Sequence, residues 1–305
     1  MPTSNKVHIF TDCDLDGAGA YFVLCATLRQ KYNYTVMRVV DVEQKIGAWL
    51  KVNDIDQFER IYILDLDISQ YPNLAKKLDK ANVTIIDHHK SHVDSKHIYT
   101  NAETIIELQT SATKMVYRHY NGKDVLTPEQ KLLVLMVDDY DSYKFNVKNS
   151  YELNIVFWSY QGDRVEKFIN DFGAGFIEFN QLHKNIISFY LKKLNNIKTN
   201  LDAHTAQLSI QGKPRKIVAV FADSCINDIA DYVIKNYKSD IGIVVNLTSN
   251  KVSLRRAKKC DVDLSLMSKM IFDEGGGHHD AAGGLMCDKF LTFTKLFKPL
   301  SLRKQ

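Results

Sequence analysis

The amino-acid sequence predicts an α/β protein in which an N-terminal parallel-sheet domain is joined by a helical linker to a smaller α/β domain. Three observations lead to this fold class. Short β-branched and apolar runs alternate with helical patterns early in the chain, which is typical of a parallel sheet with crossover helices. Several of these runs end abruptly in acidic residues or histidines. After a long helical stretch, the alternation starts again. In a chain of 305 residues we therefore expect domains at 1–185 and 204–305, joined by a linker helix at 186–203.

The composition is that of an ordinary globular protein, with 45% apolar and 25% charged residues. A formal net charge of +4 is too small to favour binding of long duplex nucleic acid. The five cysteines are scattered without a CxxC pair, which indicates a reducing compartment rather than a disulfide framework. We find no signal-peptide pattern, and no apolar run approaches the ~20 residues that span a bilayer. These features predict a cytoplasmic protein without a membrane partner.

The first strand and the first helix enclose an acidic loop. Residues 6–11 form a compact strand pattern, and residues 20–30 have the apolar spacing of a helix. Between them lie three carboxylates, those of Asp12, Asp14 and Asp16. On extended backbone Asp14 and Asp16 point in similar directions, so each can offer a hard oxygen ligand to a divalent ion. An acidic loop that caps a helix is the alternative. Carboxylates this close repel one another unless a cation is present, which favours the metal site.

Three more strand patterns follow, at 35–40, 60–64 and 83–86, separated by helical patterns at 43–51 and 71–80. The second of these strands ends at Asp65, and the third ends in Asp87, His88 and His89. The carboxyl ends of parallel strands converge on one rim of the sheet, where α/β proteins build their sites. With the acidic loop, three strands deliver carboxylates or imidazoles to this rim. The sequence therefore predicts a metal or phosphate site there.

A helical pattern at 129–137, begun by Pro128, runs into the acids Asp138, Asp139 and Asp141. Carboxylates are disfavoured at the C-terminus of a helix because of the helix dipole. Their presence at this place indicates that function overrides local stability. A solvated acidic loop is the alternative interpretation.

The remaining part of the first half reads mostly as helix. Residues 110–113 supply capping hydroxyl groups for a helix that continues to residue 120. Residues 151–200 predict further helices, and their many aromatic side chains are expected in the core rather than in a base-stacking surface. Residues 176–200 are expected to form one long connecting helix, which ends in a polar stretch that reads as a domain boundary.

The second domain has strand patterns at 206–211, 216–221, 241–247 and 252–256, and helical patterns at 224–236 and 264–272. Three consecutive glycines and two histidines follow. Successive glycines let the backbone approach a ligand and present N–H groups to an anion. An arginine on a strand of the same domain adds a planar fork for phosphate. The candidate substrate-binding residues of this domain are Arg255, Arg256, Gly275, Gly276, Gly277, His278 and His279.

Together, these motifs resemble a known family. Asp12-Cys13-Asp14-Leu15-Asp16-Gly17, Asp65, Asp87-His88-His89 and Asp139 resemble the four signature motifs of the DHH phosphoesterase superfamily. Ser253-Leu254-Arg255 and the glycine-histidine stretch resemble its DHHA1 substrate domain. The resemblance covers nearly the whole chain in the right order. It implies two Mn²⁺ ions, with Mg²⁺ or Co²⁺ as substitutes, and hydrolysis of phosphodiesters in small nucleotides or single strands. The compact length is similar to the oligoribonuclease (nano-RNase) branch.

The resemblance also implies roles for single residues. Asp14 would bind the first ion with help from Asp12, and Asp65 would bridge both ions. The second ion would be bound by Asp16, His88 and Asp139. Among the catalytic residues Asp87, His88 and His89, the first would orient His88 and the last would contact phosphate or the leaving oxygen.

One position departs from the family motifs, and the assignment of the fourth motif leaves alternatives open. Many members of the superfamily carry a histidine four residues before the first metal aspartate, whereas this chain has Phe10. For the fourth motif we choose Asp139, because its spacing to the aromatic residues that follow is similar to that of the family. Asp138 and Asp141 are the alternatives.

The expected partner is a short single-stranded RNA or DNA, or a dinucleotide, and a homodimer is left open. A RecJ-type single-strand exonuclease and a cyclic (di)nucleotide phosphodiesterase are the alternative enzymes. A nucleotide-binding regulator with an inactive site is the non-enzymatic alternative, which the nearly complete set of expected ligands disfavours. The inorganic pyrophosphatases of the superfamily carry a different C-terminal domain without this glycine motif, so they fit less well. The preferred base, the polarity of digestion and the chain-length limit are open.

Overall fold

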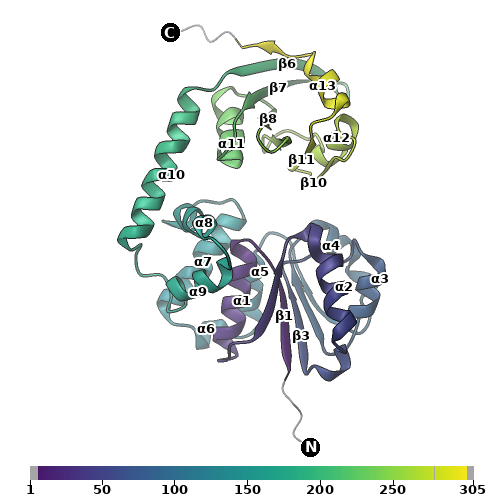
Figure 1. Cartoon of the computed structure of the whole chain (residues 1–305), viewed down its shortest axis with the longest axis vertical. Helices are drawn as coiled ribbons and strands as arrows, with labels where there is room; N and C mark the ends of the chain where they lie inside the picture. The colour runs from purple at the N-terminus through teal and green to yellow at the C-terminus, as the bar shows by residue number, and fades with distance from the viewer. Residues whose placement is uncertain (1–5, 278, 301–305) are drawn as a thin grey trace, which may run out of the picture. The chain divides into compact units, whose positions relative to one another are not determined.

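The chain forms two compact units, Met1–Ile187 and Ser188–Gln305 (Figure 1). The structure is a computed structural model, and it describes residues 6–277 and 279–300. Helix α10 (Gln181–Thr199) includes the boundary between the two units. Within the described residues, no helix is both long enough and apolar enough to cross a lipid bilayer.

The first unit contains a five-stranded parallel sheet in the order β2-β1-β3-β4-β5. Its strands are β1 (Val7–Asp12), β2 (Asn33–Met37), β3 (Arg60–Leu64), β4 (Val83–Asp87) and β5 (Glu103–Ile106). This sheet confirms the predicted fold class of the N-terminal domain. Strands β1, β3 and β4 lie side by side, so their carboxyl ends, with the acids and histidines, meet at one stretch of the rim.

Helices cover both faces of this sheet (Figure 1). One face carries α1 (Leu15–Thr27), α5 (Ala112–His119), α6 (Gly122–Val125), α7 (Pro128–Asp141), α8 (Ser150–Ser159) and α9 (Arg164–Phe172). The other carries α2 (Val42–Val52), α3 (Pro72–Leu78) and α4 (Lys90–Ser95). Short 3₁₀ turns lie at Val39–Asp41, Ile55–Gln57 and Lys96–Ile98.

The central strands are buried on both faces, which explains their continuous apolar runs. In β1, Ile9 packs into the core beneath α1, whereas its neighbour Phe10 packs into the core beneath α2. Both side chains are fully buried. Burying such a side chain stabilises the fold by about 1.5–3 kcal/mol. The sheet thus holds the strand ends in fixed positions.

Several helix boundaries differ from the sequence prediction, among them the start of α1, which is Leu15 instead of residue 20. Helix α7 starts at Pro128, with a capping box between Thr127 and Gln130, and continues to Asp141 instead of ending at residue 137. Helix α10 starts at Gln181 rather than at residue 176. Residues 176–180 are not helical, and Phe176 and Phe179 among them pack into the core.

The second unit contains a seven-stranded mixed sheet in the order β10-β11-β9-β8-β7-β6-β12. Its strands are β6 (Ala203–Ile210), β7 (Lys213–Phe221), β8 (Ile241–Asn246), β9 (Lys251–Arg256), β10 (Gly276–Gly277), β11 (Ala281–Leu285) and β12 (Lys298–Pro299). The parallel pair β7–β8 is connected through α11 (Ile226–Asn236), the kind of crossover that parallel neighbours need. Helices α12 (Leu264–Ile271) and α13 (Asp288–Thr294) pack on the opposite face. The fold class predicted for the C-terminal half is confirmed.

Candidate metal centre

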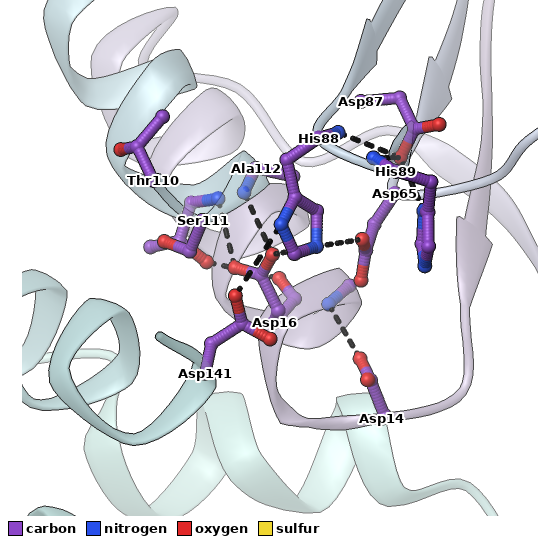
Figure 2. A network of polar contacts seen from close by, with 12 residues as sticks. Asp14, Asp16, Asp65, Asp87, His88, His89, Thr110, Ser111, Ala112 and Asp141 are labelled. Atoms are coloured by element: carbon purple, nitrogen blue, oxygen red, sulfur yellow. Dashed lines mark hydrogen bonds and ion pairs between the residues drawn. The ribbon is translucent and has the colours of Figure 1, made fainter. Parts of the chain in front are cut away.

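The predicted rim site forms at the ends of β1, β3 and β4, where acids and histidines lie within reach of one another. Asp12 and Asp87 are the last residues of β1 and β4, and Asp65 directly follows β3. Figure 2 shows the side chains of the site converging from these strands and from the ends of α1 and α7. The structure therefore brings together residues that are more than a hundred positions apart in the sequence.

The first group of potential ligands comprises Asp12, Asp14 and Asp65, which offer carboxylate oxygens within 4.8 Å of one another. Asp14 is the N-cap of α1, and its carboxylate accepts a hydrogen bond from the N–H of Gly17 at 2.9 Å. Burial, and then the charge of Asp14, raise the pKa of Asp12 to about 7. A Cβ atom on Gly17 would lie 2.5 Å from the carbonyl oxygen of Asp12, so only glycine lets α1 start this close to β1.

The second group comprises Asp16, His88 and Asp141 (Figure 2). The Nε2 atom of His88 lies 3.7 Å from a carboxylate oxygen of Asp16, and its Nδ1 atom lies 3.6 Å from one of Asp141. The N-terminus of α5 holds Asp16, since its carboxylate accepts the N–H groups of Ala112 at 2.7 Å and Thr113 at 2.9 Å. Burial raises the pKa of Asp16 nonetheless.

Asp65 belongs to the first group and also approaches His88 of the second. It is only 2% exposed, and its backbone φ is +58°, a left-handed conformation that costs free energy for a residue with a side chain. Its buried Oδ1 atom accepts no hydrogen bond, and it lies 3.2 Å from Nε2 of His88. Burial, followed by the charges of Asp16 and Asp14, raises the pKa of Asp65 well above its usual value.

This arrangement fits divalent cations. A buried carboxylate oxygen without a hydrogen-bond donor is costly unless another positive partner binds it. The carboxyl groups of Asp12, Asp16, Asp65 and Asp141 all have raised pKa values, chiefly because of burial. A cation would compensate both costs. Carboxylate oxygens with one imidazole are a donor set that suits Mn²⁺ and, with more water, Mg²⁺.

Asp87 has a different role from the predicted one. Its carboxylate does not contact the ring of His88 and accepts only the backbone N–H of that residue, at 2.8 Å. It pairs instead with Nδ1 of His89 at 2.7 Å and with Nδ1 of His92 at 2.6 Å. Although burial acts in the opposite direction, these contacts hold the pKa of Asp87 far below its usual value. The role of Asp87 is thus corrected: it orients His89 and His92.

His92 extends this network into the core and was missed by sequence reasoning. It is fully buried, and its Nε2 atom lies 3.0 Å from the hydroxyl of Tyr99. Asp67 lies 3.7 Å from its Nδ1 atom and accepts a hydrogen bond from the Ser91 hydroxyl. The spacing between His89 and His92 was the available signal, because residues three apart share one face of a helix.

In the fourth motif, the structure brings Asp141 and not the expected Asp139 into the groups of potential ligands. The carboxylate of Asp139 accepts the N–H groups of Asn146 at 2.8 Å and Val147 at 3.1 Å, and the hydroxyl of Ser150 at 2.6 Å. Although burial opposes ionisation, these hydrogen bonds lower the pKa of Asp139. They also turn its oxygens away from the other acids. Asp141 takes the place in the second group, and burial raises its pKa well above the usual value.

Asp138 does not join the metal-ligand groups either. Its carboxylate binds Nζ of Lys114 at 2.7 Å and the N–H of Ser111 at 3.0 Å. It thereby ties the end of α7 to the start of α5, the helix whose N–H groups hold Asp16. Asp138 therefore stabilises the scaffold of the site.

The second unit contains a cavity of about 390 Å³ beside the glycine-rich edge of its sheet. Arg255, Ser253, Gly276 and Gly277 are among its lining residues. Gly277 has a φ of +133°, which a residue with a side chain rarely adopts. The predicted loop is therefore a short hairpin, in which β10 pairs with β11.

The other predicted substrate-binding residues of this unit have different environments. A Cβ atom on Gly275 would clash with the carbonyl of Ser268 in α12, so this glycine serves packing. The guanidinium of Arg256 is paired with the carboxylate of Asp280, which also lies 3.2 Å from Nδ1 of His279. Arg256 and His279 do not line the cavity. His278 lies outside the described residues.

Comparisons with known proteins agree with this architecture. Residues 6–137 match the DHH family, N-terminal domain, and no curated protein matches the chain significantly. The pGpG-specific phosphodiesterase PggH from Vibrio cholerae has a similar structure, with a TM-score of 0.60 and 15% identity over 95% of this chain and 96% of that chain. The DHH domain of a member of the S1p family of ribosomal proteins gives a TM-score of 0.63 at 12% identity, over 95% and 86%. The exonuclease RecJ bound to manganese gives 0.55 at 11%, over 95% and 88%. At these identities, the structural likeness shows a common fold.

Proposed function

Because residues 6–137 match the N-terminal domain of the DHH family, we propose that this chain is a metal-dependent phosphodiesterase that hydrolyses short oligoribonucleotides and dinucleotides to mononucleotides. The proposal includes two divalent ions, preferably Mn²⁺, with Mg²⁺ or Co²⁺ as substitutes. Two chains of similar fold support it: one is a pGpG-specific phosphodiesterase, and the other is an exonuclease bound to manganese.

The observation that carries the proposal is the environment of Asp65. Its buried Oδ1 atom accepts no hydrogen bond, and its backbone is held in a left-handed conformation. A protein gains nothing in stability from this arrangement, since several carboxylates with raised pKa values surround it. Strained and unsatisfied groups of this kind concentrate at functional sites.

The residues divide into two ligand sets, and Asp65 of the first set would bridge the two ions, since it lies 3.2 Å from His88 of the second set. Asp12 and Asp14 would join Asp65 at one ion, whereas the second group, defined above, would hold the other. When bound, such ions neutralise charge on a phosphodiester and lower the pKa of water. The carboxylates would bind the ions from fixed positions, because β1, β3 and the N-terminus of α5 hold these side chains before any substrate arrives.

His89 would contact the phosphate. Although burial favours the neutral ring, its hydrogen bond with Asp87 raises the pKa of His89 to about 9, so the imidazole is protonated at neutral pH. With Nδ1 engaged by Asp87, the ring can donate from Nε2 to a phosphate oxygen or to the leaving oxygen. The buried contact between Asp87 and His92 fixes the carboxylate that orients this ring.

The second unit would contribute a phosphate-binding surface. Arg255 lines a cavity next to the glycine hairpin, and one of its Nη atoms donates to the side-chain oxygen of Asn227 at 2.8 Å, which holds the guanidinium in place. A planar guanidinium beside exposed backbone is suited to a terminal phosphate. A substrate with a second phosphate near its end, such as a dinucleotide, would use this surface.

A RecJ-type exonuclease activity on longer single strands is the second candidate, and the similarity of fold to RecJ favours it. The likeness to PggH over almost the full length of both chains supports the dinucleotide class. A nucleotide-binding regulator has less support, because its fold would gain nothing from clustered carboxylates with raised pKa values.

The decisive experiment is hydrolysis of a substrate panel with Mn²⁺ and with chelator. The panel comprises linear dinucleotides, 5′-labelled RNA of increasing length, and cyclic dinucleotides. We expect the highest kcat/KM for dinucleotides, and no activity in chelator. Cleavage of long strands in preference to dinucleotides would favour the exonuclease, and no hydrolysis of any substrate would refute the proposal.

Asp65→Asn tests the two proposed ligand sets, because it removes the charge of Asp65. The variant should fold, since asparagine tolerates the left-handed backbone of this position. The variant should lose at least ~10²-fold in rate. It should also lose the rise in melting temperature that Mn²⁺ gives to the parent protein. Asp138→Asn is the matched control, because Asp138 is buried in the same region and belongs to neither set. An unchanged Mn²⁺ effect in Asp65→Asn would contradict the assignment.

A further inference from the structure

Helix α7 ends directly after Asp141 in a Schellman turn. The N–H of Tyr143 donates to the carbonyl of Tyr140, and the N–H of Lys144 donates to the carbonyl of Asp139, both at 3.0 Å. The residue after the cap in such a turn has a left-handed backbone, and glycine usually occupies it because it has no Cβ atom. Here the position holds Tyr143, with a φ of +55°.

Phe145 repeats this unfavourable conformation two residues later, with a φ of +54°. A bulky side chain in the left-handed region crowds the following carbonyl oxygen, so both positions destabilise the folded chain. The three hydrogen bonds to the Asp139 carboxylate, described above, hold the segment after Phe145 in place. The fold thus maintains two strained aromatic residues next to the metal centre.

These two rings are also exposed to solvent, Tyr143 by 38% and Phe145 by 42%. Their centroids lie 4.7 Å apart at an angle of 67°, an edge-to-face pair. Tyr140 and Tyr151 support Phe145 from behind, with centroid distances of 5.8 and 6.2 Å. The cluster therefore presents a fixed aromatic surface, and neither strain nor exposure contributes to stability.

We propose that Tyr143 and Phe145 bind a nucleobase of the substrate by stacking. This inference rests on the proposed function, because it assigns the base of a nucleotide whose phosphate the acids and His89 bind. Asp141 and Tyr143 are two residues apart, a span of at most about 7 Å between Cα atoms, which is comparable with the distance from phosphate to base in a nucleotide. Aromatic rings bind single-stranded nucleotides with little sequence preference, since every base has a π face.

The test uses Tyr143→Gly and Phe145→Gly, because glycine removes the ring and relieves the backbone strain, so that the fold is retained. Each variant should lose about 5- to 150-fold in kcat/KM on a dinucleotide with both bases. On analogues in which one nucleoside is abasic, the analogue without the stacked base should show less than about a twofold loss. Equal losses on every analogue, or no loss on the dinucleotide, would overturn the inference.

Three control variants separate stacking from other effects. Trp158→Ala removes another exposed ring of the same unit, since Trp158 lies on α8 and is 46% exposed. This variant should keep the parent's activity on the dinucleotide and on the abasic analogues. Tyr143→Phe and Phe145→Tyr retain a π face and should keep at least about a third of the parent kcat/KM. If these aromatic replacements were as impaired as the glycine variants, stacking would not be the cause.

A binding measurement decides the inference independently of hydrolysis. By calorimetry, the parent protein should bind a nucleoside monophosphate at least about fivefold more tightly than ribose 5-phosphate, and both glycine variants should lose this preference. Equal affinity of the parent for the two ligands would overturn the stacking inference. Absence of all hydrolysis with Mn²⁺ would instead refute the proposed function, so the two failures are distinguishable.

Discussion

Three carboxylates in the last turn of α7 have three different partners, although they lie within four residues of one another. Asp138 binds a lysine, Asp139 binds the backbone of the following loop, and Asp141 joins a potential metal-ligand set. Each step along a helix turns the side chain by about 100°. Sequence reasoning ended the helix at residue 137 and chose Asp139. Which of the three acids joins the site depends on where α7 ends. The usual signal for a helix end, a glycine after the cap, is absent from the sequence, because Tyr143 holds that position.

The positions of the strand-end acids and histidines could be predicted because they follow from the sheet. Asp12 ends β1, Asp65 follows β3 and His88 follows β4, and adjacent parallel strands bring their carboxyl ends together. The partner of Asp87 could not be predicted in this way. Which imidazole its carboxylate binds depends on side-chain rotation in the first turn of α4, and there the structure selects His89 and His92 over His88.

At the residue scale, we predict that Asp141→Asn lowers kcat/KM by at least ~10²-fold, because it removes a metal ligand. The metal-free variant should melt at or above the temperature of the parent, since one of several mutually repelling buried charges is lost. Steady-state kinetics with Mn²⁺ and thermal melts in chelator measure both effects.

Asp139→Asn is the comparison variant for this prediction. It should destabilise the fold by about 1–3 kcal/mol, because the asparagine cannot accept all three hydrogen bonds of the loop, while its Mn²⁺ affinity stays close to that of the parent. The reverse pattern, in which Asp139→Asn loses Mn²⁺ and Asp141→Asn does not, would restore the original choice of Asp139.

At the scale of elements, the metal centre depends on how closely α1 approaches β1. We predict that Gly17→Ala destabilises the fold by about 1–3 kcal/mol, because its Cβ would lie 2.5 Å from the carbonyl oxygen of Asp12. The strain should also displace the acids on either side and weaken Mn²⁺ binding. Denaturant unfolding and Mn²⁺ titration of the variant are the measurements.

Gly47→Ala provides the matched control within α2. No atom lies within 4 Å of the Cβ position of Gly47, so alanine should be neutral or stabilise the helix by about 0.5–1 kcal/mol. If both variants lost stability equally, a general intolerance to alanine would explain the result, and the close approach of α1 to β1 would not.

Strand β1 also contains an ionisable group that the site does not use. His8 is 8% exposed, packs against Phe10 and Trp49, and lies 2.9 Å from the hydroxyl of Thr35. Burial lowers the pKa of His8 from 6.5 to about 4. Between these two values the unfolded chain binds a proton that the folded chain does not. The contribution of His8 to stability is therefore complete above about pH 6.5 and decreases as the pH falls toward 4.

We predict that His8→Phe reduces the acid sensitivity of the fold. Between pH 7 and pH 4.5, the parent should lose about 2 kcal/mol more of its unfolding free energy than the variant. Denaturant unfolding at both pH values gives this difference, and the contributions of the carboxylates, which both proteins share, cancel in the comparison. Identical losses in the two proteins would show that His8 is protonated in the folded state.

At the scale of the whole molecule, the fold class followed from the sequence because buried parallel strands read as uninterrupted apolar runs and the pattern restarts after a helical stretch. The start of α10 and the glycine hairpin were not predicted. Phe176 and Phe179 pack into the core from a non-helical segment before α10, and the pattern of apolar residues does not distinguish such a segment from a helix. In the hairpin Gly276 pairs with Gly283 and Gly277 pairs with Ala282 at the sheet edge, whereas glycine has low strand propensity.

The second unit supports a prediction on substrate size. Arg255→Ala should lower kcat/KM for dinucleotides about ten- to hundredfold, because a charge-assisted contact with a terminal phosphate is lost. A small aryl phosphodiester without a second phosphate should be affected much less. Arg256→Ala is the control, because Asp280 already pairs with this guanidinium. Equal losses of Arg255→Ala on both substrates would assign Arg255 to stability instead of binding.

The hydrogen bonds between Asp16 and the start of α5 have a consequence for protein synthesis. They join residues 96 and 97 positions apart, and Asp141 completes the same group from still later in the chain. A nascent chain of which only the first hundred residues have left the ribosome has β1, β3 and β4 with their acids, but not the segments that fix Asp16 or supply Asp141. The order of translation thus delays the assembly of the second group of potential ligands until most of the first unit has emerged.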